Sequence, residues 1–151
     1  MDQPGGQLSP ILVAEDNGDD VLLIQRAFTR AKLANPLHFV SDGERAIGYL
    51  SGQGAYADRT RHPLPALLLL DLKLPRKSGF EVLEWVRRQP GLSVLPVVVL
   101  TSSRESADVQ RAYALGANTY LVKPVAFDGL MEMVKSLGLY WFVTAERPAV
   151  G

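Results

Sequence analysis

The sequence predicts an α/β domain, a (βα)5 chain folded into a doubly wound, five-stranded parallel sheet. Short apolar runs alternate five times with stretches whose apolar residues recur at helical spacing. Residues 66–70 are apolar throughout, as in a strand buried on both faces of a parallel sheet. The chain has 151 residues, fewer than a closed barrel of about eight strand–helix units requires.

Composition excludes several classes of protein. Lys plus Arg equals Asp plus Glu at 16 each, and this balance argues against a nucleic-acid or anionic-membrane partner. There is no cysteine, so neither a disulfide framework nor a thiolate site is expected. The longest apolar runs are too short to span a bilayer, and residues 1–10 lack the apolar core of a signal peptide. We therefore expect a cytoplasmic protein.

The elements follow one another along the chain after a disordered lead, residues 1–9. The expected strands cover residues 11–14, 37–40, 66–70, 95–100 and 118–122. The expected helices contain residues 21–31, 42–50, 80–86, 105–115 and 127–137.

Helix and loop boundaries rest on local chemistry. Asp19 or Asp20 suits the N-cap of the first helix, Asp42 opens the second, and Gly116 stands at the C′ position of the fourth. Residues 51–64 form a loop that is long for a compact domain, which indicates an insertion or a partner surface. Arg59 and Arg61 in this loop are expected to be solvated charges, with a kinase contact as the alternative.

The central strand ends on Asp71. A charged residue at the end of a buried strand is costly unless something there uses it. Pro75 and Gly79 supply a rigid corner and a flexible entry to the next helix. We therefore place Asp71 at the mouth of a cleft, at the carboxyl end of its strand.

Polar residues also follow the other strands, and the carboxyl ends of parallel strands share one edge of the sheet. Carboxylates repel one another by roughly 4 kcal/mol per pair at about 4 Å and an effective dielectric constant of about 20. One lysine offsets one charge, so the excess calls for a hard divalent cation, and oxygen ligands suit Mg²⁺. The residues at the strand ends are Glu15, Asp16, Asp71, Thr101 and Lys123.

These residues have the parts needed to accept a phosphoryl group. Asp71 would be the nucleophile. Mg²⁺ and Lys123 would neutralise charge on the phosphoryl oxygens, and Thr101 would donate a hydrogen bond to one of them. No phosphate-binding P-loop is present, so ATP is not expected to be the direct donor. His38 and His62 lack metal-ligand spacing, and we expect them to be structural.

Five motifs together resemble the CheY-like receiver domain of two-component response regulators, over residues 10–138. The resemblance implies a flavodoxin-like strand order, 2-1-3-4-5, and phosphotransfer to Asp71 from a phosphohistidine of a sensor histidine kinase. The motifs are Asp71-x3-Pro75-x3-Gly79, Glu15-Asp16, Thr101-Ser102, Lys123-Pro124 and, three residues before Lys123, Tyr120.

The resemblance also implies roles for single residues. Asp16, Asp71 and the backbone carbonyl of Lys73 would bind Mg²⁺, and Glu15 would act mainly through water. Tyr120 would be the switch aromatic that turns inward when Thr101 moves. The Lys123–Pro124 peptide bond is expected to be cis.

Narrower features resemble stand-alone regulators of phytochrome-type kinases. These features are the 51–64 loop, the Asp-Leu-x-Leu-Pro motif at Asp71 and the aromatic extension, residues 139–151. We expect no output domain, because the chain after Pro124 is too short for a DNA-binding module. A homodimer through the last helix and the aromatic extension is expected, with folding back onto the domain's own core as the alternative.

Three functions compete. A signalling receiver that catalyses only its own phosphotransfer and dephosphorylation, and is not otherwise an enzyme, fits every motif. A phosphatase with an aspartyl-phosphate intermediate typically carries an acid two residues past its nucleophile, where this chain has Lys73. A pseudo-receiver that is never phosphorylated would not need the intact acidic residues, Thr101 and Lys123. Lys73 and Ser103 occupy positions that tune hydrolysis in receivers, so they bear on the lifetime of the phosphoryl group.

Overall fold

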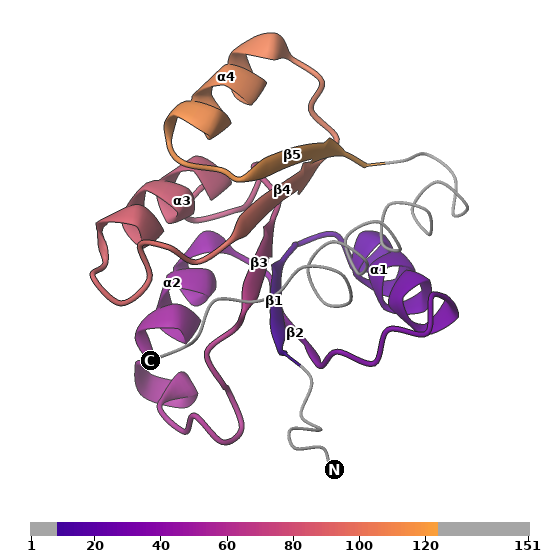
Figure 1. Ribbon diagram of the computed structural model, residues 1–151, viewed down its shortest axis with the longest axis vertical. Helices are drawn as coiled ribbons and strands as arrows, with labels where there is room; N and C mark the ends of the chain where they lie inside the picture. The colour runs from indigo at the N-terminus through magenta and orange to yellow at the C-terminus, as the bar shows by residue number, and fades with distance from the viewer. Residues whose placement is uncertain (1–8, 124–151) are drawn as a thin grey trace.

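A computed structural model describes residues 9–123 of the chain (Figure 1). The predicted last helix and the aromatic extension lie outside these residues. Every strand lies within two residues of its predicted bounds. The strands are β1 (Ile11–Ala14), β2 (Leu37–Val40), β3 (Leu67–Leu70), β4 (Val97–Thr101) and β5 (Thr119–Val122). The helices are α1 (Gly18–Arg30), α2 (Gly43–Ser51), α3 (Gly79–Arg88) and α4 (Ser106–Ala114), with a 3-10 turn, η2 (Gly54–Tyr56).

The five strands form one parallel sheet in the order β2-β1-β3-β4-β5. This order confirms the predicted doubly wound α/β fold. Figure 1 shows α1 on one side of the sheet and α2 and α3 on the other. Because alternate residues of a strand point to opposite faces, the sheet has two apolar cores. Leu68 and Leu70 face α2 and α3, whereas Leu67 and Leu69 face α1.

The first helix begins earlier than predicted. Its N-cap is Asn17, whose side chain accepts a hydrogen bond of 3.0 Å from the backbone N–H of Asp20. The prediction of Asp19 or Asp20 as the cap is therefore wrong. Both aspartates lie instead in the first turn, where negative charge complements the positive end of the helix dipole.

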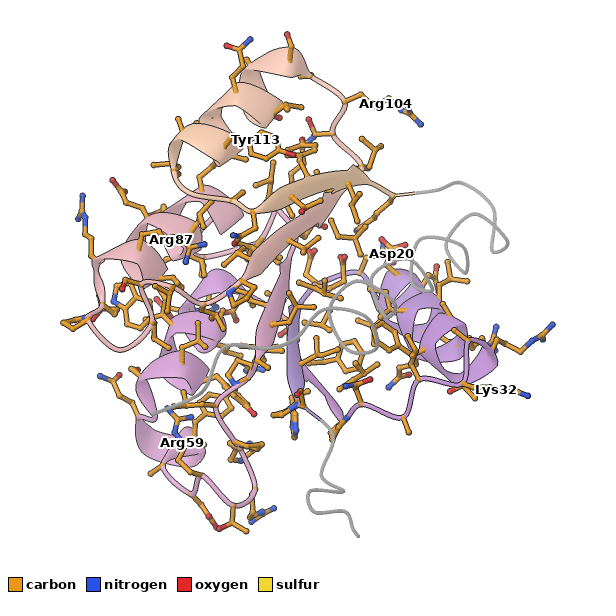
Figure 2. All side chains as sticks on the ribbon, viewed as in Figure 1. Asp20, Lys32, Arg59, Arg87, Arg104 and Tyr113 are labelled. Atoms are coloured by element: carbon orange, nitrogen blue, oxygen red, sulfur yellow. The ribbon has the colours of Figure 1, made fainter. Side chains whose placement is uncertain are left out.

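The loop after α2 is tied to that helix by Arg59, which is labelled in Figure 2. Its guanidinium donates hydrogen bonds of 2.7 Å to the carbonyl of Tyr49 and 2.8 Å to that of Leu50. A third bond of 3.1 Å reaches the carbonyl of His62. Carbonyls in the last turn of a helix lack partners within the helix. Arg59 therefore caps α2 and is not the solvated charge that we predict, whereas Arg61 is exposed as expected.

Four rings pack between this loop, α2 and the edge strand β2. The ring centroids of Tyr49 and Tyr56 are 5.2 Å apart, and those of Tyr56 and His62 are also 5.2 Å apart. His38 lies 5.9 Å from Tyr49, and the Tyr49 hydroxyl donates a 2.9 Å bond to the carbonyl of Pro63. Such contacts stabilise ring pairs beyond the burial of their area. Both histidines are thus structural, as predicted.

The ring packing predicts a pH-dependent stability. Burial, and then the nearby charge of His62, lower the pKa of His38 below its usual value of 6.5. The unfolded chain therefore binds a proton that folded His38 resists, and the stability from neutral His38 is full above about pH 6.5 and is lost below it. Urea unfolding at about pH 7.5 and about pH 5.5 should show a smaller loss of unfolding free energy for His38→Gln than for wild type. Equal losses would exclude His38 as the cause.

Within residues 9–123, no helix combines the length and the apolar character that a membrane crossing requires.

Candidate functional site

The pairing of the strands brings four predicted residues to one end of the sheet. Ala14 pairs with Leu70, so Glu15 and Asp71 follow neighbouring strands at the same level. The backbone N–H of Asp71 donates a 3.1 Å bond to the carbonyl of Ala14. On the other side, the N–H of Lys123 donates a 2.8 Å bond to the carbonyl of Thr101.

Three carboxylates gather there. Glu15, Asp16 and Asp71 each offer an oxygen, and these oxygens lie within 4.8 Å of one another. Asp16 is exposed, whereas Glu15 is 3 % exposed and Asp71 is 6 % exposed. The sequence places Asp71 at the mouth of a cleft, but in the structure it is nearly buried beside the exposed Asp16. The sequence pattern shows that a strand ends at Asp71. It does not show how far the following turn shields the Asp71 side chain from solvent.

Lys123 holds this cluster together. Its ammonium lies 2.6 Å from Glu15 Oε1, 2.9 Å from Asp71 Oδ2 and 2.8 Å from Asp20 Oδ2. Asp20 is on α1 and is labelled in Figure 2 beside the start of that helix. Sequence reasoning considered it only as a helix cap and missed its place in the site, because no local pattern links it to Lys123.

The cluster shifts the protonation of its members. Burial raises the pKa of Glu15 to about 7, and the hydrogen bond from Lys123 offsets this only in part. Burial works against the charge of Lys123, but hydrogen bonds to Asp20, Glu15 and Asp71 outweigh it and raise its pKa above the usual value. Lys123 therefore stays charged and faces an excess of negative charge.

The backbone around Asp71 is closely packed. Its Oδ1 accepts a 3.2 Å hydrogen bond from the N–H of Lys73, which joins the carboxylate to the following turn. A Cβ at Gly79 would lie 2.2 Å from the carbonyl oxygen of Asp71, so only glycine lets α3 begin this close to β3. Ser78 and Glu81 form a capping box at the start of α3 that the sequence reading missed.

Thr101 and Tyr120 meet through Ser103 in the loop after β4. The hydroxyl of the fully buried Thr101 accepts a 3.5 Å bond from the N–H of Ser103. The Tyr120 hydroxyl donates a 3.0 Å bond to the carbonyl of Ser103, whose own hydroxyl donates a 2.6 Å bond to Asp108. Among residues 9–123, no hydrogen bond joins Thr101 to Asp71. Lys73 is exposed, and the Lys123–Pro124 bond lies outside the described residues.

The carboxylates suit a divalent cation. The donor set is all oxygen, which hard cations prefer. Opposite ligands of Mg²⁺ lie about 4.2 Å apart, since each is about 2.1 Å from the ion. The oxygens of the three carboxylates, within 4.8 Å of one another, therefore need only a small adjustment to share one ion.

Comparison with known proteins finds similar sequences and structures over most of the chain. The sequence model of one protein family, the response regulator receiver domain, matches residues 11–135. The response regulator Rcp1 of Synechocystis is 38% identical over 139 residues, which cover 92% of this chain and 92% of Rcp1. The probable methanogenesis regulatory protein FilR2 of Methanothrix harundinacea is 40% identical over 134 residues, covering 87% of this chain and 82% of FilR2.

Two solved structures are also similar. The phosphorylated cyanobacterial phytochrome response regulator RcpA superimposes with a TM-score of 0.86 at 37% identity, covering 94% of this chain and 99% of RcpA. The Mn²⁺-bound form of Rcp1 gives a TM-score of 0.83 at 38% identity, covering 93% of this chain and 99% of that one.

Proposed function

Because the chain belongs to the response regulator receiver domain family, we propose that it is a single-domain response regulator that accepts a phosphoryl group on Asp71 and signals by changing its protein contacts. The observation that carries the proposal is the position of Lys123. Its ammonium is 2.9 Å from Asp71 Oδ2, at the edge of an acidic cluster suited to a cation.

The chemistry follows from these contacts. A carboxylate oxygen of Asp71 forms a bond to phosphorus, and the bond from phosphorus to its donor breaks, with the electron pair leaving on the donor. The donor atom is nitrogen in a phosphohistidine and oxygen in acetyl phosphate. Lys123 binds a phosphoryl oxygen and Thr101 donates a hydrogen bond to another. A divalent cation, when bound, adds positive charge beside those oxygens.

We assign the cation as Mg²⁺, with Asp16, Asp71 and the backbone carbonyl of Lys73 as ligands and Glu15 acting mainly through water. The all-oxygen donor set supports a hard cation of this kind. The Mn²⁺-bound form of Rcp1 is consistent with a divalent ion in a similar protein.

Tyr120 is the proposed switch residue. Its hydroxyl holds the Ser103 carbonyl, and the Ser103 N–H holds Thr101, so a movement of Thr101 toward the phosphoryl group would act on both partners. Coupling of about 1–3 kcal/mol between the acceptor and the face that carries Tyr120 is enough for a switch.

The proposed donor is a sensor histidine kinase of the phytochrome type, in the cytoplasm. Similarity to the phytochrome response regulator RcpA supports this choice. A relative of similar identity, FilR2, is named as a probable methanogenesis regulatory protein, so other kinases are the alternative donors. A receiver domain spanning residues 10–138 and a homodimer through the last helix and residues 139–151 complete the proposal. That helix and extension lie outside the described residues.

Labelling with acetyl phosphate tests the proposal. In Mg²⁺ the intact mass should rise by one labile phosphoryl group, and excess chelator should abolish the gain while circular dichroism shows an unchanged fold. The metal dependence follows because Lys123 alone cannot balance the carboxylates and the incoming phosphate. Persistent labelling in chelator would contradict the metal assignment.

Two other outcomes would replace the proposal. Rapid turnover of diverse phosphomonoesters would indicate a phosphatase with an aspartyl-phosphate intermediate. A complete lack of labelling in Mg²⁺ would indicate a pseudo-receiver.

A further inference from the structure

Asp20 differs from the other carboxylates that contact Lys123. Glu15 and Asp71 belong to the group of three that can share a cation, and Asp20 does not. Asp20 Oδ2 is nevertheless 2.8 Å from the ammonium, as close as Asp71 Oδ2 at 2.9 Å. A bound cation therefore draws on Asp71 directly and on Glu15 mainly through water, and Asp20 remains as a carboxylate partner of Lys123 alone.

The ammonium has no spare donor in this arrangement. A lysine carries three N–H donors. Three carboxylates, from Glu15, Asp20 and Asp71, lie within 2.9 Å of Lys123 Nζ. A phosphoryl oxygen that arrives at Asp71 must take one of these donors or share it. Once a cation is bound at Asp71, with Glu15 engaged mainly through water, the remaining competitor is Asp20.

We propose that Asp20 is a positioning residue that acts through Lys123: it binds the ammonium and so competes with the phosphoryl group for it. The strength with which the site binds a phosphoryl dianion is thus set in part by a residue of α1. This inference rests on the proposed function, because it concerns the phosphoryl group accepted on Asp71.

Asp20 can be changed without damage to the fold. Its side chain is 31% exposed, and the helix cap uses its backbone N–H and not its carboxylate. Asp19, one residue earlier, supplies a matched control. It is exposed on the same turn, and its side chain forms no hydrogen bond or ion pair with any described residue.

The kinetic test measures the rate of labelling against acetyl phosphate concentration at saturating Mg²⁺. Asp20→Asn is expected to lower the half-saturating concentration by about threefold or more, since one competing ion pair is lost, while the maximal rate changes less. Asp20→Glu keeps a carboxylate and should behave as wild type. Asp19→Asn removes the same charge away from Lys123 and should leave the curve unchanged.

A second readout needs neither metal nor phosphate. In the metal-free protein, the ¹H–¹⁵N signal of the Lys123 ammonium should be visible by NMR, because three hydrogen bonds slow its exchange with water. Asp20→Ala should broaden or remove this signal while the backbone spectrum stays folded.

The outcomes separate the two proposals. If wild type is not labelled at all, the proposed function fails. If wild type is labelled but Asp20→Asn leaves the half-saturating concentration unchanged or raises it, or Asp19→Asn lowers it equally, the role of Asp20 is wrong. An unchanged Lys123 signal in Asp20→Ala would also overturn it.

Discussion

Asp71→Asn is expected to abolish labelling by acetyl phosphate and, in metal-free buffer, to make the protein more stable. An amide is not a nucleophile for phosphorus under these conditions, so the signal should fall below detection. Stability should rise because one of the carboxylates around Lys123 loses its charge, while Glu15 and Asp20 still pair with the ammonium. We expect a gain of about 1–2 kcal/mol in the free energy of unfolding, from relief of repulsion in a nearly buried cluster.

Urea unfolding with and without Mg²⁺ measures the expected gain in the stability of Asp71→Asn. Asp19→Asn, the exposed control on α1, should change the free energy of unfolding by less than about 0.5 kcal/mol. The gain in Asp71→Asn should shrink in Mg²⁺, because the ion stabilises wild type more than the variant. Retained labelling in Asp71→Asn would show that another residue accepts the phosphoryl group.

Arg87→Ala is expected to destabilise the protein by about 2–3 kcal/mol, because a half-buried guanidinium that binds several backbone carbonyls at once is lost. Arg87 is on α3 and is labelled in Figure 2. It donates bonds of 2.7 Å to the Gly116 carbonyl, 2.8 Å to the Leu95 carbonyl and 3.0 Å to Asn118 Oδ1. One side chain thus joins α3 to the chain before β4 and to the turn before β5.

Arg88→Ala is the matched control, because Arg88 is exposed and makes a single 3.0 Å pair with Glu84 one turn away. That variant should lose no more than about 0.5 kcal/mol. Urea unfolding of both variants measures the two losses of unfolding free energy. Similar small losses in the two would mean that Arg87 does not clamp these segments.

The strands were predictable because each is a short apolar run between polar residues. An uninterrupted run such as Leu67–Leu70, short and preceded by Pro65, favours a strand buried on both faces over a helix. Parallel pairing then places the residues after each strand at one edge. That is why the juxtaposition of Glu15, Asp71 and Lys123 follows from the pattern without any knowledge of side-chain packing.

Other features depend on contacts that a local pattern does not contain. The sequence predicts Arg59 to be a solvated charge, and nothing in the sequence sets Arg87 apart, because the main partners of both are backbone carbonyls that only the folded chain brings near. Asn17, Asp19 and Asp20 are all good N-cap residues, so composition alone does not choose among them. The contact of Asp20 with Lys123 joins residues far apart in the chain, and it forms only once folding brings the residue after β5 to the start of α1.

The most direct test of the account is to find which residue carries the phosphoryl group. Borohydride reduces an aspartyl phosphate to homoserine with release of phosphate, and peptide mass spectrometry then reads the position. After labelling with acetyl phosphate in Mg²⁺, we predict homoserine at position 71 and at no other aspartate. Homoserine at a different position, or a stable phosphate on a serine or threonine, would contradict the account.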